Sequence, residues 1–113
     1  ADRRFHVAIA RATRNSAIVL VVETLWDLRY KSPLCANMLA RGRAVGVRPL
    51  IDDHVEILES LKTRDPRKAR AAMHHHLGTV IENLLTATEL EAVQRAQSEV
   101  AARRSELARR TAL

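Results

Sequence analysis

Residue types that stabilise small disulfide-rich or turn-rich folds are scarce in this chain of 113 residues. A single cysteine excludes an intramolecular disulfide framework and a cysteine-based zinc finger. Three glycines and three prolines are too few for an all-β fold with many tight turns. One Phe, one Trp and one Tyr leave a core of aliphatic side chains and alanine. The length fits one domain, or a part of one.

Long apolar runs are also lacking. The longest, Ala17 to Val22, falls far short of the roughly 20 residues that cross a bilayer, so no membrane partner is expected. No signal peptide is visible. We expect Cys35 to be a reduced thiol and the protein to be cytoplasmic. The sequence starts at Ala1 and reads as helix from its first residues. We therefore expect a processed or truncated product.

Acidic residues are outnumbered by basic ones. Nineteen Lys and Arg against 13 Asp and Glu give a net charge of +6, and the pI is near 10.7. Such a balance is typical of proteins that bind nucleic acid or acidic ligands. The arginines are dispersed, however, and no aromatic residues alternate with them to stack on bases. The pattern favours a solvated basic surface over a DNA-binding segment.

Apolar residues recur at spacings of three and four along most of the chain, which predicts helices. Asn15 and Asp65 are predicted N-caps, and Pro66 would take the first helical position. Thr88 and Glu91 match a capping box. The expected fold is an all-α antiparallel helical bundle. The predicted helices are 2–14, 17–30, 49–62, 66–85 and 88–109.

Three of these segments carry further expectations. The helix at 17–30 is apolar most of the way round and should be central and buried. Residues 31–47 contain Pro33, Gly42 and Gly46 and are predicted to form a connector with a short helical turn around 34–39. Such a long connector suggests a pocket lid or a mobile segment. The weakly amphipathic helix at 88–109 should pack peripherally or against a partner.

Histidines on the predicted apolar stripes point to a metal site. Asp2 and His6 are four residues apart on one helix face, while His54 and His76 lie in the stripes of two other helices. A bundle would bring the four side chains together. One carboxylate and three imidazoles suit zinc, nickel, manganese or iron. Hydrogen-bonded core histidines are the alternative, and the neighbouring His74 and His75 are expected at the surface.

The same residues fall into an ordered set of motifs. Asp2 to His6 reads Asp-x-x-Phe-His, and Asn15 follows nine residues later. His54 to Leu58 reads His-x-x-Ile-Leu, and Asp65 to Leu77 contains Asp-(x)3-Ala-(x)3-Met-x-x-His-Leu. In this order and spacing, residues 1–85 resemble the FCD ligand-binding domain. That domain is the C-terminal half of FadR-subfamily GntR transcription regulators.

The resemblance implies that one divalent metal, zinc first among the candidates, is held inside a helical bundle by Asp2, His6, His54 and His76. It also implies a small carboxylate effector bound at that metal. Residues 1–85 would form the C-terminal part of the bundle, incomplete at its N-terminal side, and 86–113 a helical extension. DNA would be bound through a winged-helix domain that is absent from this chain, and a homodimer is expected.

Two residues outside the ligand set are candidates for effector binding. Asn83 lies seven residues after His76 and should face the same pocket, and Arg29 ends the predicted central helix. Both side chains can hydrogen-bond a carboxylate.

Two other functions remain open. A metal-dependent hydrolase would need a general base, but Glu56 and Glu59 should point away from His54, and Asp53 is expected to neighbour it in sequence only. No catalytic motif is present, so no catalytic residue is assigned and an enzyme is not expected. A metal-free helical dimerisation module, using 88–109 and the basic surface, is the second alternative.

Overall fold

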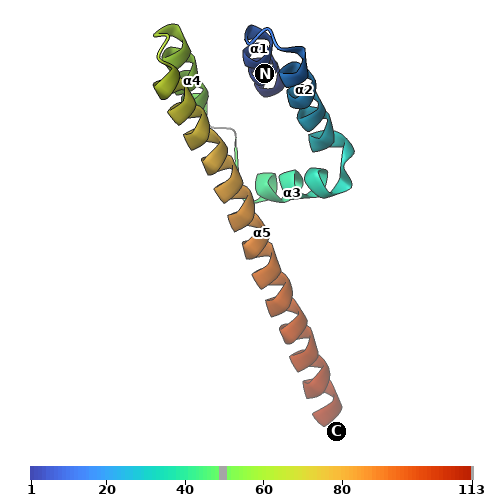
Figure 1. Ribbon diagram of the computed structural model, residues 1–113. Helices are drawn as coiled ribbons and strands as arrows, with labels where there is room; N and C mark the ends of the chain where they lie inside the picture. Colours follow the sequence, from blue (N-terminus) through green and yellow to red (C-terminus); the bar gives the residue numbers. More distant parts are fainter. Residues whose placement is uncertain (49–50, 113) are drawn as a thin grey trace.

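The computed structural model describes residues 1–48 and 51–112, and within these ranges it contains helices and no strand (Figure 1). The all-α prediction is therefore confirmed. One antiparallel hairpin is formed by α1 and α2, a second by α4 and α5, and α3 crosses between α2 and α5. The helices are α1 (Asp2–Ala12), α2 (Ser16–Lys31), α3 (Pro33–Ala44), α4 (Ile51–Lys62) and α5 (Pro66–Thr111).

Helices α2 and α5 begin directly after the N-cap residues that the sequence predicted, Asn15 and Asp65. The Asn15 side chain accepts hydrogen bonds from the backbone N–H of Ala17 at 3.0 Å and of Ile18 at 3.4 Å. Asp65 accepts from the backbone N–H of Arg67 and of Lys68, each at 3.0 Å. These bonds satisfy backbone donors that the first helical turn leaves without partners. Both predicted N-caps are confirmed, and each starts the second helix of a hairpin.

The prediction of a connector at 31–47 is wrong for most of its length, because α3 occupies Pro33–Ala44. The Ser32 side chain caps this helix by accepting from the Cys35 N–H. Gly42 does not break the helix: it is buried, and a Cβ at this position would lie 3.3 Å from Cδ2 of Leu84 in α5. The glycine thus serves close packing between α3 and α5. Residues 49 and 50, at the predicted start of the next helix, lie outside the described residues.

The predicted break after residue 85 is also wrong. A single helix, α5, runs from Pro66 to Thr111, and Thr88 lies inside it. The Thr88 hydroxyl donates to the Leu84 carbonyl at 2.8 Å, a bond within the helix rather than a cap. Every described residue from 92 to 112 is exposed, and the molecule extends 75 × 25 × 19 Å as a result (Figure 1).

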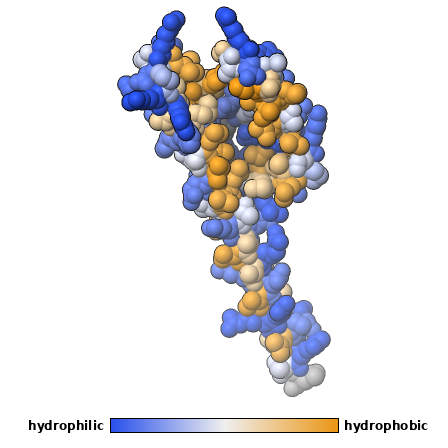
Figure 2. Space-filling model, in the orientation of Figure 1, coloured by the Kyte–Doolittle hydropathy of each residue, from blue (hydrophilic) through white to orange (hydrophobic). Residues whose placement is uncertain are grey.

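The core is small and lies where the hairpins and α3 meet. The expectation that 17–30 forms a buried central helix is wrong, since Trp26 is the one buried residue of α2. Leu20 and Leu25 remain 66% and 60% exposed, because α2 packs on α1 and α3 and its apolar residues surround the helix. Figure 2 shows apolar residues (orange) gathered over the upper part of the molecule, where the two hairpins and α3 lie. The buried apolar residues are Val7, Ala10, Trp26, Ile57, Ala72 and Ala87.

Across the described residues, no helix combines the length and apolarity that crossing a bilayer requires.

Candidate metal centre

Three histidines from three helices meet between the two hairpins. His6 lies on α1, His54 on α4 and His76 on α5. One ring nitrogen from each lies within 4.8 Å of the corresponding nitrogens of the other two. His76 is 5% exposed, and the other two are half-buried. The cluster therefore joins segments that are far apart in the sequence and places their ring nitrogens around one point.

The Asp2 carboxylate, in the first turn of α1, contacts two of the three imidazoles. Its Oδ1 lies 3.2 Å from Nε2 of His6 and 3.1 Å from Nε2 of His54. Donor atoms bound at about 2.0–2.1 Å to a tetrahedral ion lie about 3.3–3.4 Å apart. The contacts of Asp2 with His6 and His54 are close to this separation, so these three side chains are spaced as ligands of one ion would be.

Aromatic contacts fix the imidazoles against one another. His6 stacks on His76 with ring centroids 5.4 Å apart, and the centroids of His54 and His76 are 4.5 Å apart. Phe5 meets the His54 ring edge-on, and Trp26 lies 5.7 Å from His6. Burial lowers the pKa of His6 below its usual 6.5, although the Asp2 charge opposes the shift. The lowered pKa favours the neutral form of the His6 ring, which is the form that can bind a metal.

Asp53 is a site residue that the sequence reasoning missed. Its Oδ2 lies 3.3 Å from Nδ1 of His76, and the two side chains are 12% and 6% exposed. The expectation that Asp53 neighbours His54 in sequence only is therefore wrong. A signal was available, because Asp53 precedes Ile57 by four residues and shares its helix face. Ile57 is 1% exposed, and that buried face of α4 packs on α5.

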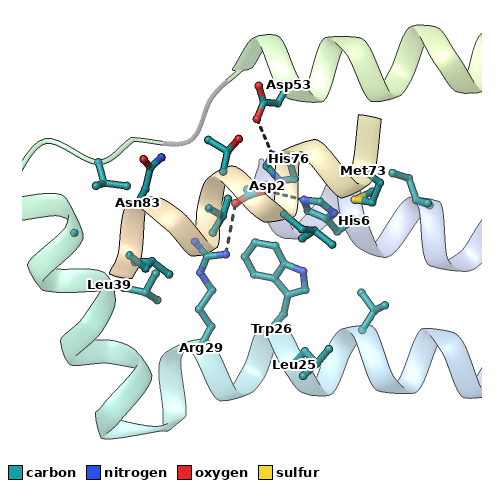
Figure 3. Close-up of a pocket in the computed structure, with 18 of the residues that line it drawn as sticks. Asp2, His6, Leu25, Trp26, Arg29, Leu39, Asp53, Met73, His76 and Asn83 are labelled. Atoms are coloured by element: carbon teal, nitrogen blue, oxygen red, sulfur yellow. Dashed lines mark hydrogen bonds and ion pairs between the residues drawn. The ribbon is translucent and has the colours of Figure 1, made fainter. Parts of the chain in front are cut away.

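A cavity of about 520 Å³ opens beside the cluster (Figure 3). Asp2, His6 and His76 form part of its wall, and most of the remaining lining is apolar. Arg29 and Asn83, the two candidate effector ligands, also line it. The apolar lining residues include Ile9, Val22, Leu25, Trp26, Leu39, Met73, Val80 and Leu84.

Arg29 is held at this wall by two contacts. Its guanidinium carbon lies 4.5 Å from the Trp26 ring centroid, and its Nη1 lies 3.8 Å from Oδ2 of Asp2. Figure 3 shows the Arg29 side chain rising between α2 and the Asp2 carboxylate. The arrangement places a cation beside the histidine cluster, facing the cavity. His74 and His75 are exposed and lie outside the cluster, as expected.

Comparison with known proteins gives a consistent family match. Residues 1–79 match the model of the FCD domain. The chain is 37% identical over 76 residues to the Exu regulon transcriptional regulator of Escherichia coli (strain K12), covering 67% of this chain and 30% of that protein. It is 34% identical over 92 residues to the Uxu operon regulator of Haemophilus influenzae, covering 80% and 35%.

A third relative is the Glc operon transcriptional activator of Escherichia coli (strain K12), 29% identical over 83 residues, covering 74% of this chain and 33% of that protein. The chain therefore spans about a third of the length of the curated relatives it matches. No solved structure matches it significantly.

Proposed function

This chain belongs to the FCD domain family, and we propose that it is the effector-sensing part of a bacterial GntR-type transcription regulator. The regulator names of its relatives support this role and favour it over an enzyme. Residues 1–85 would form the sensing bundle and 86–113 a helical extension. DNA would be read by a winged-helix domain outside this chain, in a homodimer.

We propose further that Asp2, His6, His54 and His76 hold one divalent metal ion, with zinc the first candidate and nickel, manganese and iron the others. The observation that carries this proposal is the convergence of the three imidazoles and one carboxylate from three helices. Imidazole nitrogens and a carboxylate oxygen are ligand types that borderline divalent ions prefer.

The effector in this proposal is a small carboxylate that binds in the cavity, at the metal. A carboxylate oxygen can occupy a coordination position otherwise held by water. Arg29 lies on the same wall and offers a planar pair of N–H donors, and Asn83 offers an amide across the cavity. The apolar lining would exclude water and strengthen these polar contacts.

The site is suited to signalling because its ligands belong to different packing units. Asp2 and His6 lie in the first hairpin, and His54 and His76 lie in the second. An effector that binds one arrangement of the hairpins more tightly shifts the population toward it. That shift would change the dimer arrangement and the spacing of the DNA-reading domains.

Metal content tests the site directly. We expect near-stoichiometric divalent metal in the purified chain by elemental mass spectrometry, and a strong loss in the His54→Ala and His76→Ala variants. The matched controls are His74→Ala and His75→Ala, which remove exposed histidines from the same helix. Unchanged metal content in His54→Ala and His76→Ala would overturn the metal proposal.

Thermal shift assays with small carboxylates test the effector proposal. We expect one or more mono- or dicarboxylates to raise the melting temperature of the metal-loaded chain, and the rise to vanish after chelation. Arg29→Ala should weaken the response, whereas Arg4→Ala, on an exposed part of α1, should not. Stabilisation that persists equally in chelated protein would separate the effector from the metal and contradict the proposal.

A further inference from the structure

Asp53 and His54 are consecutive residues of α4, and each forms an Asp–His contact with a different helix. Successive residues of a helix project about 100° apart, so neighbours can face different helices. His54 points its Nε2 at Asp2 of α1, while Asp53 points its carboxylate at Nδ1 of His76 on α5. Figure 3 shows Asp53 reaching from α4 toward His76.

The chemistry of the Asp53 contact selects one tautomer of His76. An ionised carboxylate only accepts hydrogen bonds, so the imidazole nitrogen that faces it must carry the proton. A neutral His76 then has its lone pair on Nε2. His6 and His54 also direct Nε2 into the cluster, toward Oδ1 of Asp2. By the same rule, His6 and His54 would carry their protons on Nε2 in the metal-free chain. The Asp53 contact instead leaves the Nε2 lone pair of His76 available to an ion.

We infer that Asp53 is a positioning residue of the proposed metal site: it accepts the Nδ1–H hydrogen bond of His76 and presents Nε2 to the ion. The inference rests on the proposed function. Carboxylates that hold a ligating histidine in this way fix its tautomer and ring orientation, and removing them typically lowers metal affinity about 10–100-fold.

Two other roles for Asp53 are separable from this one. As a direct ligand, it would change the donor set of the ion when replaced. As a residue of the first turn of α4, it would stabilise the helix through the backbone dipole. Asp52 shares that first turn and that charge but is exposed. Asp52→Asn is therefore a matched control for the helix contribution.

The first readout is the tautomer of His76 in the metal-free chain, from imidazole ¹⁵N chemical shifts at a pH where the ring is neutral. The His76 signals are assigned by their loss in His76→Gln. We expect the Nδ1–H form in the unmodified chain and in Asp52→Asn. Asp53→Ala and the isosteric Asp53→Asn should shift the ring toward Nε2–H, the form favoured by imidazole in water. An Nε2–H tautomer in the unmodified chain would overturn the inference.

The second readout is zinc affinity, measured by competition with a chromophoric chelator, together with the absorption spectrum of the cobalt-loaded chain. We expect affinity to fall about 10–100-fold in Asp53→Ala and to change little in Asp52→Asn. The cobalt spectrum should keep the same band pattern in Asp53→Asn, because the donor set is unchanged. An altered donor set, or affinity equal to that of the unmodified chain, would contradict the positioning role.

The two readouts also separate this inference from the proposed function. A chain that binds no metal, yet shows the Asp53-dependent Nδ1–H tautomer, would overturn the metal site. It would confirm the hydrogen bond but overturn its role in positioning a ligand.

Discussion

At the scale of single residues, His6 shows how burial and charge compete. The ring lies against Trp26 and the other two imidazoles, and its burial favours the neutral form. The Asp2 carboxylate favours the charged form but does not outweigh burial. The burial of His6 therefore makes its protonation unfavourable in the folded chain, and the neutral form is the one that can bind a metal.

The lowered pKa of His6 predicts a pH dependence for the stability of the metal-free chain. As the pH falls through 6.5, the unfolded chain takes up a proton at His6 before the folded chain does, so the free energy of unfolding decreases. Urea unfolding between about pH 7.5 and pH 5 measures this decrease. His6→Gln should flatten the slope, and equal slopes in the two proteins would contradict the assignment.

The sequence predicted the three clustered histidines because each lies on an apolar stripe with the spacing of an α-helix. Placing Asp2 and His6 on one helix face required only their spacing of four residues. Placing His54 and His76 in the interior required only the amphipathic pattern of their helices. Asp53 was misread because its role depends on how α4 is rotated relative to α5. That rotation is set by packing between helices, which the local pattern of α4 does not contain.

At the scale of elements, α3 and α5 show where local signals fail. Gly42 was read as part of a connector, yet it lies in a helix and permits close contact with Leu84. Thr88 and Glu91 were read as a capping box, yet Glu91 pairs with Arg41 of α3 at 2.6 Å and Thr88 bonds within α5. In both cases, contacts between α3 and α5 override the local preference.

The close contact at Gly42 predicts that a large side chain there is destabilising. In Gly42→Leu the new side chain would meet Leu84 at 3.3 Å and Val47 at 3.6 Å from its Cβ alone. We expect a loss of about 1–3 kcal/mol in the free energy of unfolding, measured in urea, because α3 must move away from α5. Gly78→Leu is the control, since no atom lies within 4 Å of a Cβ there. It should be neutral or stabilising by up to about 1 kcal/mol, and equal losses in both variants would contradict this explanation.

At the scale of the whole molecule, the two hairpins are joined by few backbone contacts. The helices pack as α1 on α2, α2 on α3, α3 on α5 and α4 on α5. In the described residues, α1 reaches α4 and α5 through side chains, namely Asp2 and Phe5 to His54, and His6 to His76. The all-helical class follows from the periodicity of the sequence, whereas this open arrangement depends on contacts between segments distant in sequence.

If the four proposed ligands bind one ion, the metal should act as a clamp between the hairpins. Ligands from α1, α4 and α5 would then be bonded to a common centre, and opening the hairpins would require breaking metal–ligand bonds. We expect zinc to raise the hydrogen-exchange protection of α1 and of the first turns of α4, relative to the chelated chain. The distal part of α5, residues 95–111, is an internal control because it is exposed and remote from the ligands. Its protection should not change with zinc, and His76→Ala should abolish the effect in α1. Equal gains along the whole chain would point to nonspecific binding by surface side chains, and no gain in α1 would mean that the site does not join the hairpins.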